Sequence, residues 1–278
     1  MSTIDRVTGL LGGDGLRFGD PQGAGALTVV PVFHEGEQVP YRLFAEARVT
    51  GMVEVGEVDG GSVPNLQVVN HLGQAVLLVE GEVLGGLRQT RTLNTTVLVP
   101  AHSAVTVPVA CVEAGRWGAA RPYDREAFHA SPRVRHSKNV GIEARAAGGG
   151  GLYADQGMVW LAVDEDLGLH GVASPTRSHA EAHHRRVGDI ESLTRRLRPV
   201  EGQRGVRALV GGRPVALDLF DRPGTLTALW PALVGSYAAD ALLATGAPGP
   251  GEVAVAVAMV RDLAAGRAGA HPAVGEGE

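Results

Sequence analysis

The region from Ala26 to Glu113 most constrains the fold, because it is a series of short apolar runs interrupted by glycine, proline and asparagine. Short β-branched runs with such boundaries are typical of strands. The predicted strands are Leu27–Phe33, Leu66–Val69, Ala75–Val79, Val97–Pro100 and Val105–Val112. Tyr41–Val49 is the exception and predicts a short helix. We therefore expect a largely antiparallel β-sheet core in the first half of the chain.

The second half alternates predicted helices with one hairpin. The capping-box pattern Ser178-His179-Ala180-Glu181 opens a helix that ends before Pro199. Gly211-Gly212 separates two β-branched runs, Val206–Val210 and Val215–Phe220, and so predicts a hairpin with a two-residue turn. Further helices are predicted over Thr225–Ala244, which contains Pro231, and over residues 252–265. The predicted fold class is α+β, with a largely antiparallel sheet core followed by helices and a β-hairpin.

One long segment, residues 114–151, has no sustained apolar period and is rich in arginine, glycine and alanine. A stretch of this length without structure is either a functional loop or a disordered one. We therefore predict a single domain over residues 1–246 that contains a long loop at 114–151. Residues 247–278 are predicted to be a C-terminal helix and a loose tail.

The composition excludes several classes of protein. Apolar residues make up 44% and charged residues 20% of the 278 residues, which excludes a disordered chain. No apolar run reaches the ~18 residues of a membrane helix, and the N-terminus lacks a cationic leader, so we expect a cytoplasmic protein without a membrane partner. The net charge is −5, without interleaved basic and aromatic residues, which argues against nucleic-acid binding. Arginine-rich segments at 116–145 and 177–213 favour a small anionic ligand.

Polar residues gather between Glu80 and Asn94 within otherwise apolar sequence. Residues two apart on a strand share a face, so Glu80 and Glu82 are expected to point the same way, as are Gln89 and Arg91. Of two neighbouring carboxylates, one can be held protonated and act as an acid while the other acts as a base. The alternative is an exposed strand face with a Glu–Arg ion pair.

A second polar group follows the last predicted strand of this region. Cys111 and Glu113 share a face, and Arg116-Trp117 comes directly after. Cys111 would be a nucleophile if a nearby cation stabilised its thiolate; a buried, inert thiol is the alternative. Arg116 and Trp117 would clamp an anionic, ring-bearing ligand, or Trp117 would anchor a loop.

Histidines give a weaker signal. His179 and His183 stand four residues apart on a predicted helix, a spacing that suits a metal ion, but no HExxH motif occurs. His102 and Ser103 lie in a predicted turn, without a GxSxG motif that would support a serine nucleophile. We predict no metal site.

The run from Glu80 to Trp117, EGEVLGGLRQTRTLNTTVLVPAHSAVTVPVACVEAGRW, resembles a mostly bacterial protein family. That family is named for its association with ADP-ribosylglycohydrolases and a rhodanese–phosphatase superfamily. The likeness covers most of residues 7–242. It implies a role near NAD and ADP-ribose metabolism, and it assigns neither a reaction nor a role to any residue. The family motif falls on Glu82, Gln89, Arg91, Asn94, Cys111, Glu113, Arg116 and Trp117, with Gln156 and Trp160 further on.

The leading hypothesis is a cytosolic enzyme that acts on a small phosphorylated metabolite, such as a derivative of NAD or ADP-ribose. Three carboxylates are the catalytic candidates: Glu82 and Glu113 as acid and base, with Glu80 as a neighbour that tunes them. The binding candidates are Gln89 and Asn94 for orientation, Arg91 and Arg116 for phosphate, and Trp117 for a ring; Cys111, Gln156 and Trp160 are further candidates. One alternative is a non-catalytic binding or regulatory module. Another is a metal-dependent β-fold enzyme that uses some of Glu80, Glu82, His102 and Glu113. The sequence names no cofactor and leaves open the oligomeric state and whether the protein is catalytic.

Overall fold

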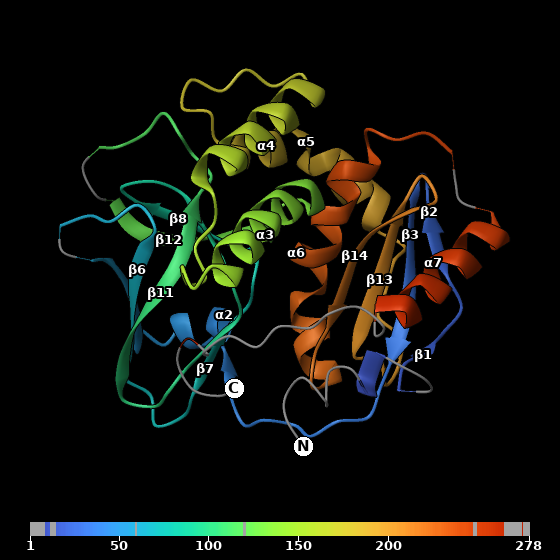
Figure 1. The fold of residues 1–278 in the computed structure, drawn as a ribbon, viewed down its shortest axis with the longest axis horizontal. Helices are drawn as coiled ribbons and strands as arrows, with labels where there is room; N and C mark the ends of the chain where they lie inside the picture. The colour runs from blue at the N-terminus through green and yellow to red at the C-terminus, as the bar shows by residue number, and fades with distance from the viewer. Residues whose placement is uncertain are drawn as a thin grey trace. The chain divides into compact units, whose positions relative to one another are not determined.

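The computed structural model describes residues 9–11, 15–58, 60–118, 121–246, 249–263 and 274. The fold is α+β, as predicted (Figure 1). The chain divides into two compact units: Met1–Val39 with Arg186–Ala270, and Pro40–Arg185 with His271–Glu278.

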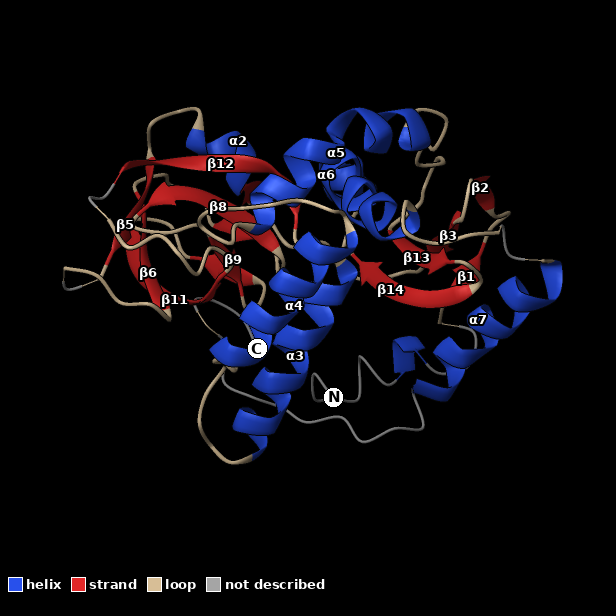
Figure 2. Ribbon diagram, turned by 90° about the horizontal axis from the view of Figure 1, so that it is seen from above, coloured by secondary structure: helices blue, strands red, loops and turns tan. Residues whose placement is uncertain are grey.

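The first unit combines strands from both ends of the chain. Its strands are β1 (Arg17–Phe18), β2 (Gln22–Ala24), β3 (Leu27–Phe33), β13 (Gly205–Val210) and β14 (Arg213–Leu219), and its helices are α6 (Pro223–Ala241) and α7 (Pro250–Leu263). The sheet is antiparallel in the order β1-β3-β13-β14, and β2 also pairs with β3. Successive residues of β3 face opposite sides of the sheet. Val29 packs with α6, whereas Val30 packs with Ala256 of α7. Figure 2 shows the two helices on opposite sides of the sheet.

The predicted hairpin is confirmed. β13 and β14 pair antiparallel, and the turn residues Gly211 and Gly212 have φ angles of 54° and 78°. Two consecutive positive φ angles are what a two-residue turn of this twist requires, and glycine adopts them without steric cost. The predicted helix that contains Pro231 is also confirmed, as α6.

The second unit holds the remaining strands. They are β4 (Arg42–Leu43), β5 (Val53–Glu57), β6 (Asn65–Asn70), β7 (Val76–Leu78), β8 (Glu82–Leu87), β9 (Arg91–Leu93), β10 (Val97–Val99), β11 (Ser103–Cys111) and β12 (Arg121–His129). A six-stranded sheet has the order β12-β8-β9-β11-β6-β5, and a three-stranded sheet has the order β10-β7-β4. The paired strands are antiparallel as predicted, except that β4 and β7 are parallel.

Helices accompany these sheets. The helices are α2 (Phe44–Arg48), α3 (Pro132–Ala147), α4 (Gln156–Leu169) and α5 (His179–Thr194), and the boundary between the two units falls within α5. One face of the larger sheet contributes Leu66, Leu93 and Val107 to an apolar cluster that includes Phe44 of α2. The other face packs Val83 and Ala110 against α3 and α4.

The prediction of a long loop at 114–151 is wrong, because this segment contains β12 and α3. Ser131 caps α3 by accepting a hydrogen bond from the Val134 N–H, and Pro132 occupies the first helical turn. The buried face of α3 includes Lys138 and Gly141, where an apolar residue would be expected. The apolar period that identifies an amphipathic helix is therefore interrupted. Apart from residue 274, the predicted tail after residue 266 lies outside the described residues.

None of the helices in the described part of the chain combines the length and the apolar character that crossing a bilayer requires.

Candidate functional site

The candidate site lies at one end of the six-stranded sheet, where β5, β8 and β11 end and β9 begins. The strand register places Glu57 opposite Leu66, and Leu66 opposite Val107. Leu66 and Val107 belong to the apolar cluster that covers one face of the sheet. Arg91 is the register partner of Cys111. Two residues away on the same pair of strands, Leu93 is the partner of Val109, and both belong to the same apolar cluster. Because side chains alternate between faces, Glu57, Arg91 and Cys111 project from the same face of the sheet.

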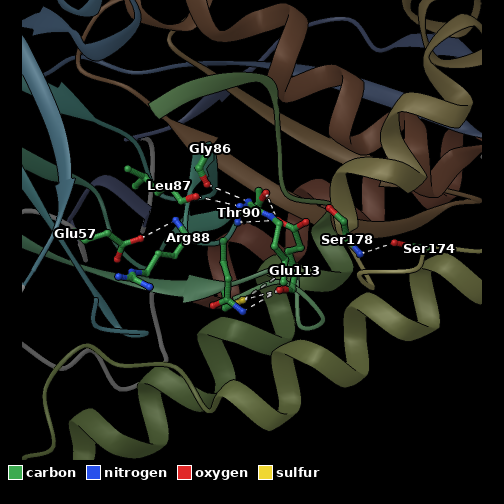
Figure 3. Close-up of polar contacts among 11 residues, drawn as sticks. Glu57, Gly86, Leu87, Arg88, Thr90, Glu113, Ser174 and Ser178 are labelled. Atoms are coloured by element: carbon green, nitrogen blue, oxygen red, sulfur yellow. Dashed lines mark hydrogen bonds and ion pairs between the residues drawn. The ribbon is translucent and has the colours of Figure 1, made fainter. Parts of the chain in front are cut away.

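Glu113 and Arg116 hold the turn between β8 and β9. One Glu113 oxygen, Oε2, accepts hydrogen bonds from the Thr90 backbone N–H at 3.0 Å and the Thr90 hydroxyl at 2.8 Å, and pairs with Arg116 at 2.7 Å. Arg116 also donates to the carbonyl oxygens of Gly86 and Leu87, each at 3.0 Å (Figure 3). Leu87 has a φ of +48°, which is uncommon for a residue with a side chain. These contacts therefore fix a strained turn.

The same contacts set the charge of Glu113. Burial raises the pKa of this carboxyl, but the hydrogen bonds from Arg116 and Thr90 outweigh burial and hold the pKa below its usual range. Glu113 is therefore ionised at neutral pH, which argues against the acid role and leaves the base role. The other carboxylate oxygen, Oε1, makes no hydrogen bond to any residue that the structure describes.

Cys111 is fully buried and held by its neighbours. The side-chain amide of Gln156, at the start of α4, bonds both the N–H and the carbonyl oxygen of Cys111 at 2.8 Å. The thiol donates to the Glu113 carbonyl oxygen at 3.3 Å. Burial raises the pKa of the Cys111 thiol, which favours the inert-thiol alternative. Trp160 lies one turn beyond Gln156, and its buried Nε1 has no hydrogen-bond partner in the described part of the chain.

Arg91 is the most unusual residue of the site. Its side chain has no exposed surface, and Nε donates to the Val63 carbonyl oxygen at 3.1 Å. The terminal nitrogens Nη1 and Nη2 are buried without a hydrogen-bond partner among the described residues. The Arg91 guanidinium lies 5.8 Å from the Trp117 ring centroid, and the Arg88 guanidinium lies 5.6 Å from it. Burial lowers the pKa of Arg91, because the surroundings disfavour its charge.

Two buried acceptors accompany these donors. Glu57 accepts the Arg88 backbone N–H at Oε1, at 2.9 Å, while Oε2 is buried without a partner in the described residues. Gln89 donates to the Glu113 carbonyl oxygen at 3.1 Å, and its own Oε1 likewise lacks a partner. Glu57 is not among the residues predicted from the sequence. The alternation in β5, VEVGE, carries the signal, since it puts Glu57 on the face of Val53 and Val55.

Glu80 belongs to a different group, which we call the Glu80–Lys138 cluster (Glu80, Asn94, Arg135, Lys138 and Asn139). Arg135 donates to Glu80 Oε2 at 2.9 and 2.6 Å, and the Lys138 ammonium lies 2.6 Å from Oε1. Lys138 also donates to the Asn94 carbonyl oxygen and to the Asn139 side chain, each at 2.9 Å. Burial raises the pKa of Glu80, but the two cations outweigh burial and lower it overall. Glu80 is thus held ionised and is not a proton donor.

The prediction that Glu80 and Glu82 share a strand face is wrong. Gly81 has a φ of +84° and forms a turn between them, and β8 begins only at Glu82. Glu82 accepts the Val79 N–H at 2.8 Å and is the register partner of His129 on β12. Both carboxylates stand at the opposite end of β8 from Leu87, and Asn94 lies past the far end of β9. The site therefore keeps Gln89, Arg91, Cys111, Glu113, Arg116 and Trp117, and not Glu80, Glu82 or Asn94.

Comparison with known families agrees with the resemblance of the central motif. The model of the ARPP-1 domain, described as the ARG and Rhodanese-Phosphatase-superfamily-associated Protein domain, matches residues 15–278. The chain belongs to the ARPP-1 family. The match extends past residue 242, where the likeness found in the sequence ends. No match was found among curated proteins or among solved structures.

Two histidines of this ARPP-1 protein are held by hydrogen bonds and ring packing. His179 Nε2 accepts the Ser131 N–H at 3.2 Å, and Nδ1 lies 3.4 Å from Asp166. His183 stacks on Phe128 with ring centroids 4.2 Å apart, and burial lowers its pKa to about 4. Among the described residues, no group of three His, Cys, Asp or Glu side chains is placed to hold a metal ion.

Proposed function

We propose that this ARPP-1 protein is a cytosolic enzyme that binds a small phosphorylated metabolite, related to NAD or ADP-ribose, at Arg91 and converts it. The observation that carries the proposal is the fully buried Arg91 guanidinium with Nη1 and Nη2 unpartnered among the described residues. Two parallel N–H groups match two oxygens of one phosphate. The association in the family's name with ADP-ribosylglycohydrolases supports the metabolite class.

The energetic cost of Arg91 supports a ligand. A buried donor without a partner costs about 1–3 kcal/mol, and more when the group is charged. A native structure that keeps such a group calls for an explanation, of which a bound anion or ordered water is the simplest. The nearby ring of Trp117, 48% exposed, adds an aromatic surface. Phosphate and ring recognition together favour a nucleotide-like ligand.

Glu113 is the proposed proton acceptor. Its Oε2 is engaged by Thr90 and Arg116, which fixes the carboxylate and leaves Oε1 for a water or a ligand hydroxyl. The lowered pKa keeps this carboxylate ionised, as a general base requires. Gln89, which is fixed to the Glu113 carbonyl oxygen at 3.1 Å, would orient the ligand through its Oε1.

The same electrostatics favour a second candidate, a binding or regulatory module without catalysis. A lowered pKa makes Glu113 a weak base, and the raised pKa of Cys111 leaves the thiol protonated. In this case the ligand would bind at Arg91 and leave unchanged.

The test is to incubate the protein with NAD, ADP-ribose, ADP-ribose phosphates, nicotinamide mononucleotide and AMP, and to measure thermal stability and product masses in the same samples. Arg91→Met is compared with Arg207→Met. Arg207 is a matched control because it is also buried, donates to the Ala216 carbonyl oxygen at 3.3 Å and has an unpartnered Nε among the described residues.

An enzyme is expected to be stabilised by one ligand and to consume it, with both effects lost in Arg91→Met and kept in Arg207→Met. Stabilisation without consumption selects the binding module. If none of these ligands stabilises the wild type or is consumed, the proposed function is wrong.

A further inference from the structure

We propose that Glu57 is a second ligand-binding residue, which accepts a hydroxyl of the same ligand whose phosphate Arg91 holds, so that the ligand is a sugar phosphate. This inference rests on the proposed function, since it takes Arg91 as the phosphate site. It adds a residue that lies outside the family motif found in the sequence, and it narrows the ligand to esters that carry free hydroxyl groups.

Hydrogen bonds attach Glu57, and the loop after it, to the residues that lead into β9. The loop that follows β5 is attached at both ends to the segment between β8 and β9. At one end the Arg88 N–H donates to Glu57 at 2.9 Å, and at the other Arg91 donates to the Val63 carbonyl oxygen at 3.1 Å. Figure 3 shows Glu57 beside Arg88. Since Glu57 and Arg91 also share a sheet face, their polar groups converge at the same end of the sheet.

At this end of the sheet, both hydrogen-bond donors and hydrogen-bond acceptors are left without partners among the described residues. The donors are Arg91 Nη1 and Nη2, and the acceptors are Glu57 Oε2 and Gln89 Oε1; all are buried without a hydrogen-bond partner in the described chain. The negative charge of Glu57 acts on the guanidinium of Arg91, yet the described residues contain no ion pair between them. A phosphate ester with free hydroxyl groups satisfies both kinds of atom, because its phosphate accepts and its hydroxyls donate. A phosphate ester without hydroxyl groups satisfies only the donors.

The loop after β5 packs closely against residues next to the proposed site. Gly61, in the loop after β5, packs so closely that a Cβ there would lie 2.9 Å from Arg88 Nε and 3.2 Å from the Trp117 ring. Its φ of +128° is also one that other residues rarely adopt. The loop therefore lies against Arg88 and Trp117, the two residues beside Arg91.

The experiment is isothermal titration of the wild type, Glu57→Gln, Glu54→Gln and Arg91→Met with ribose 5-phosphate and with ethyl phosphate, which has no hydroxyl on its carbon chain. Glu54 is the matched control because it lies on the same strand with its side chain 69% exposed. A hydrogen bond to a charged group is worth about tenfold or more in affinity. The wild type and Glu54→Gln should therefore prefer ribose 5-phosphate over ethyl phosphate by about tenfold or more. Glu57→Gln should reduce the preference, because glutamine keeps an acceptor oxygen but loses the charge. Arg91→Met should lower the affinity for both ligands.

If the wild type binds ribose 5-phosphate and ethyl phosphate with equal affinity, the proposed role of Glu57 is wrong. This comparison uses the wild type alone, so it does not depend on whether a variant folds. An unchanged preference in Glu57→Gln would also overturn the role of Glu57. If Arg91→Met lowers the affinity for both ligands in either of these two outcomes, the proposed function stands and only the role of Glu57 is wrong. If the wild type binds neither phosphate, the inference fails, and the metabolite panel decides separately whether the proposed function fails.

Discussion

Two groups of buried charges in the second unit differ in how completely they are paired. In the Glu80–Lys138 cluster, three oxygen atoms lie 2.6–2.9 Å from the lysine nitrogen, and Glu80 also accepts two bonds from Arg135. At the other end of β8, Arg91 makes one hydrogen bond, to Val63, among the described residues. Both groups are polar clusters within apolar surroundings. The ion pairs of the buried cations distinguish the group that stabilises the fold from the group that is proposed to bind a ligand.

The pairing also explains why the sole lysine of the chain is buried. Its ammonium lies 2.6 Å from Glu80 Oε1 and donates to two further oxygen atoms at 2.9 Å, and the opposite charge offsets much of the cost of burial. Burial still lowers the pKa of Lys138. Arg91 is different, because a guanidinium has five N–H donors and one of them is used. Lys138 and Arg135 thus face a carboxylate, whereas the described residues form no ion pair with Arg91, and we take this difference to separate a structural group from the proposed binding site.

The largest expected effect tests the structural side of this comparison. Glu80→Gln removes the charge that pairs with Lys138 and Arg135, and leaves two buried cations without a carboxylate. Breaking one partner of a buried ion pair costs about 3–5 kcal/mol. Chemical denaturation should show a loss of that size in the free energy of unfolding. Glu143→Gln, at an exposed position of α3, should change it by less than about 0.5 kcal/mol. A loss for Glu80→Gln as small as the control's would show that the cluster is not structural.

An intermediate effect is expected from pH. The pKa of Glu80 is lowered from its ordinary value of 4.5 in the folded protein, so the unfolded chain binds its proton first as the pH falls. Its contribution to stability is therefore complete above about pH 4.5 and is lost as the pH falls through the lowered folded value. The stability difference between wild type and Glu80→Gln should be greatest near pH 7 and shrink toward pH 3. A difference that does not change over this range would contradict the pairing described for Glu80.

The smallest effect on stability is expected at Arg91. Arg91→Met removes a buried charge that has one hydrogen bond and keeps most of the side-chain volume, so the free energy of unfolding should change by less than about 1 kcal/mol, or rise. Denaturation without added ligand measures this change. A loss comparable to that of Glu80→Gln would make Arg91 a structural residue and would remove the contrast between the two groups.

Local sequence signals predicted most of the elements. The β-branched runs gave β3, β6, β7, β10 and β11, and the Gly211-Gly212 signal gave the β13–β14 hairpin. The helix α3 escaped prediction because Lys138 and Gly141 occupy its buried face. Lys138 fits there only through Glu80, and Gly141 because a Cβ would lie 2.7 Å from the Asp155 backbone nitrogen of the segment that enters α4. Neither partner is visible from a local pattern.

The candidate site was predicted in part for a similar reason. The spacing of the motif predicted Gln89, Arg91, Cys111 and Glu113, because these residues lie on or next to two neighbouring strands, β9 and β11. It failed at Glu80 and Glu82, where the positive φ of Gly81 turns the chain between them. It missed Glu57, which lies on β5 and is separated from β9, the strand of Arg91, by β6 and β11 in the sheet order.

The sequence by itself determined the α+β class, most strands and helices, the hairpin turn and the family, because each depends on residues close together in the chain. The tertiary structure decided which elements pair. It placed β3, from the strand-rich first half, beside β13 of the second half, and it gave the Glu80 carboxylate two cations from α3. It also left Arg91 buried with a single hydrogen bond among the described residues. Burial and pairing depend on atoms brought together from distant parts of the chain, so neither the stability of one charged group nor the proposed ligand site of the other follows from local pattern.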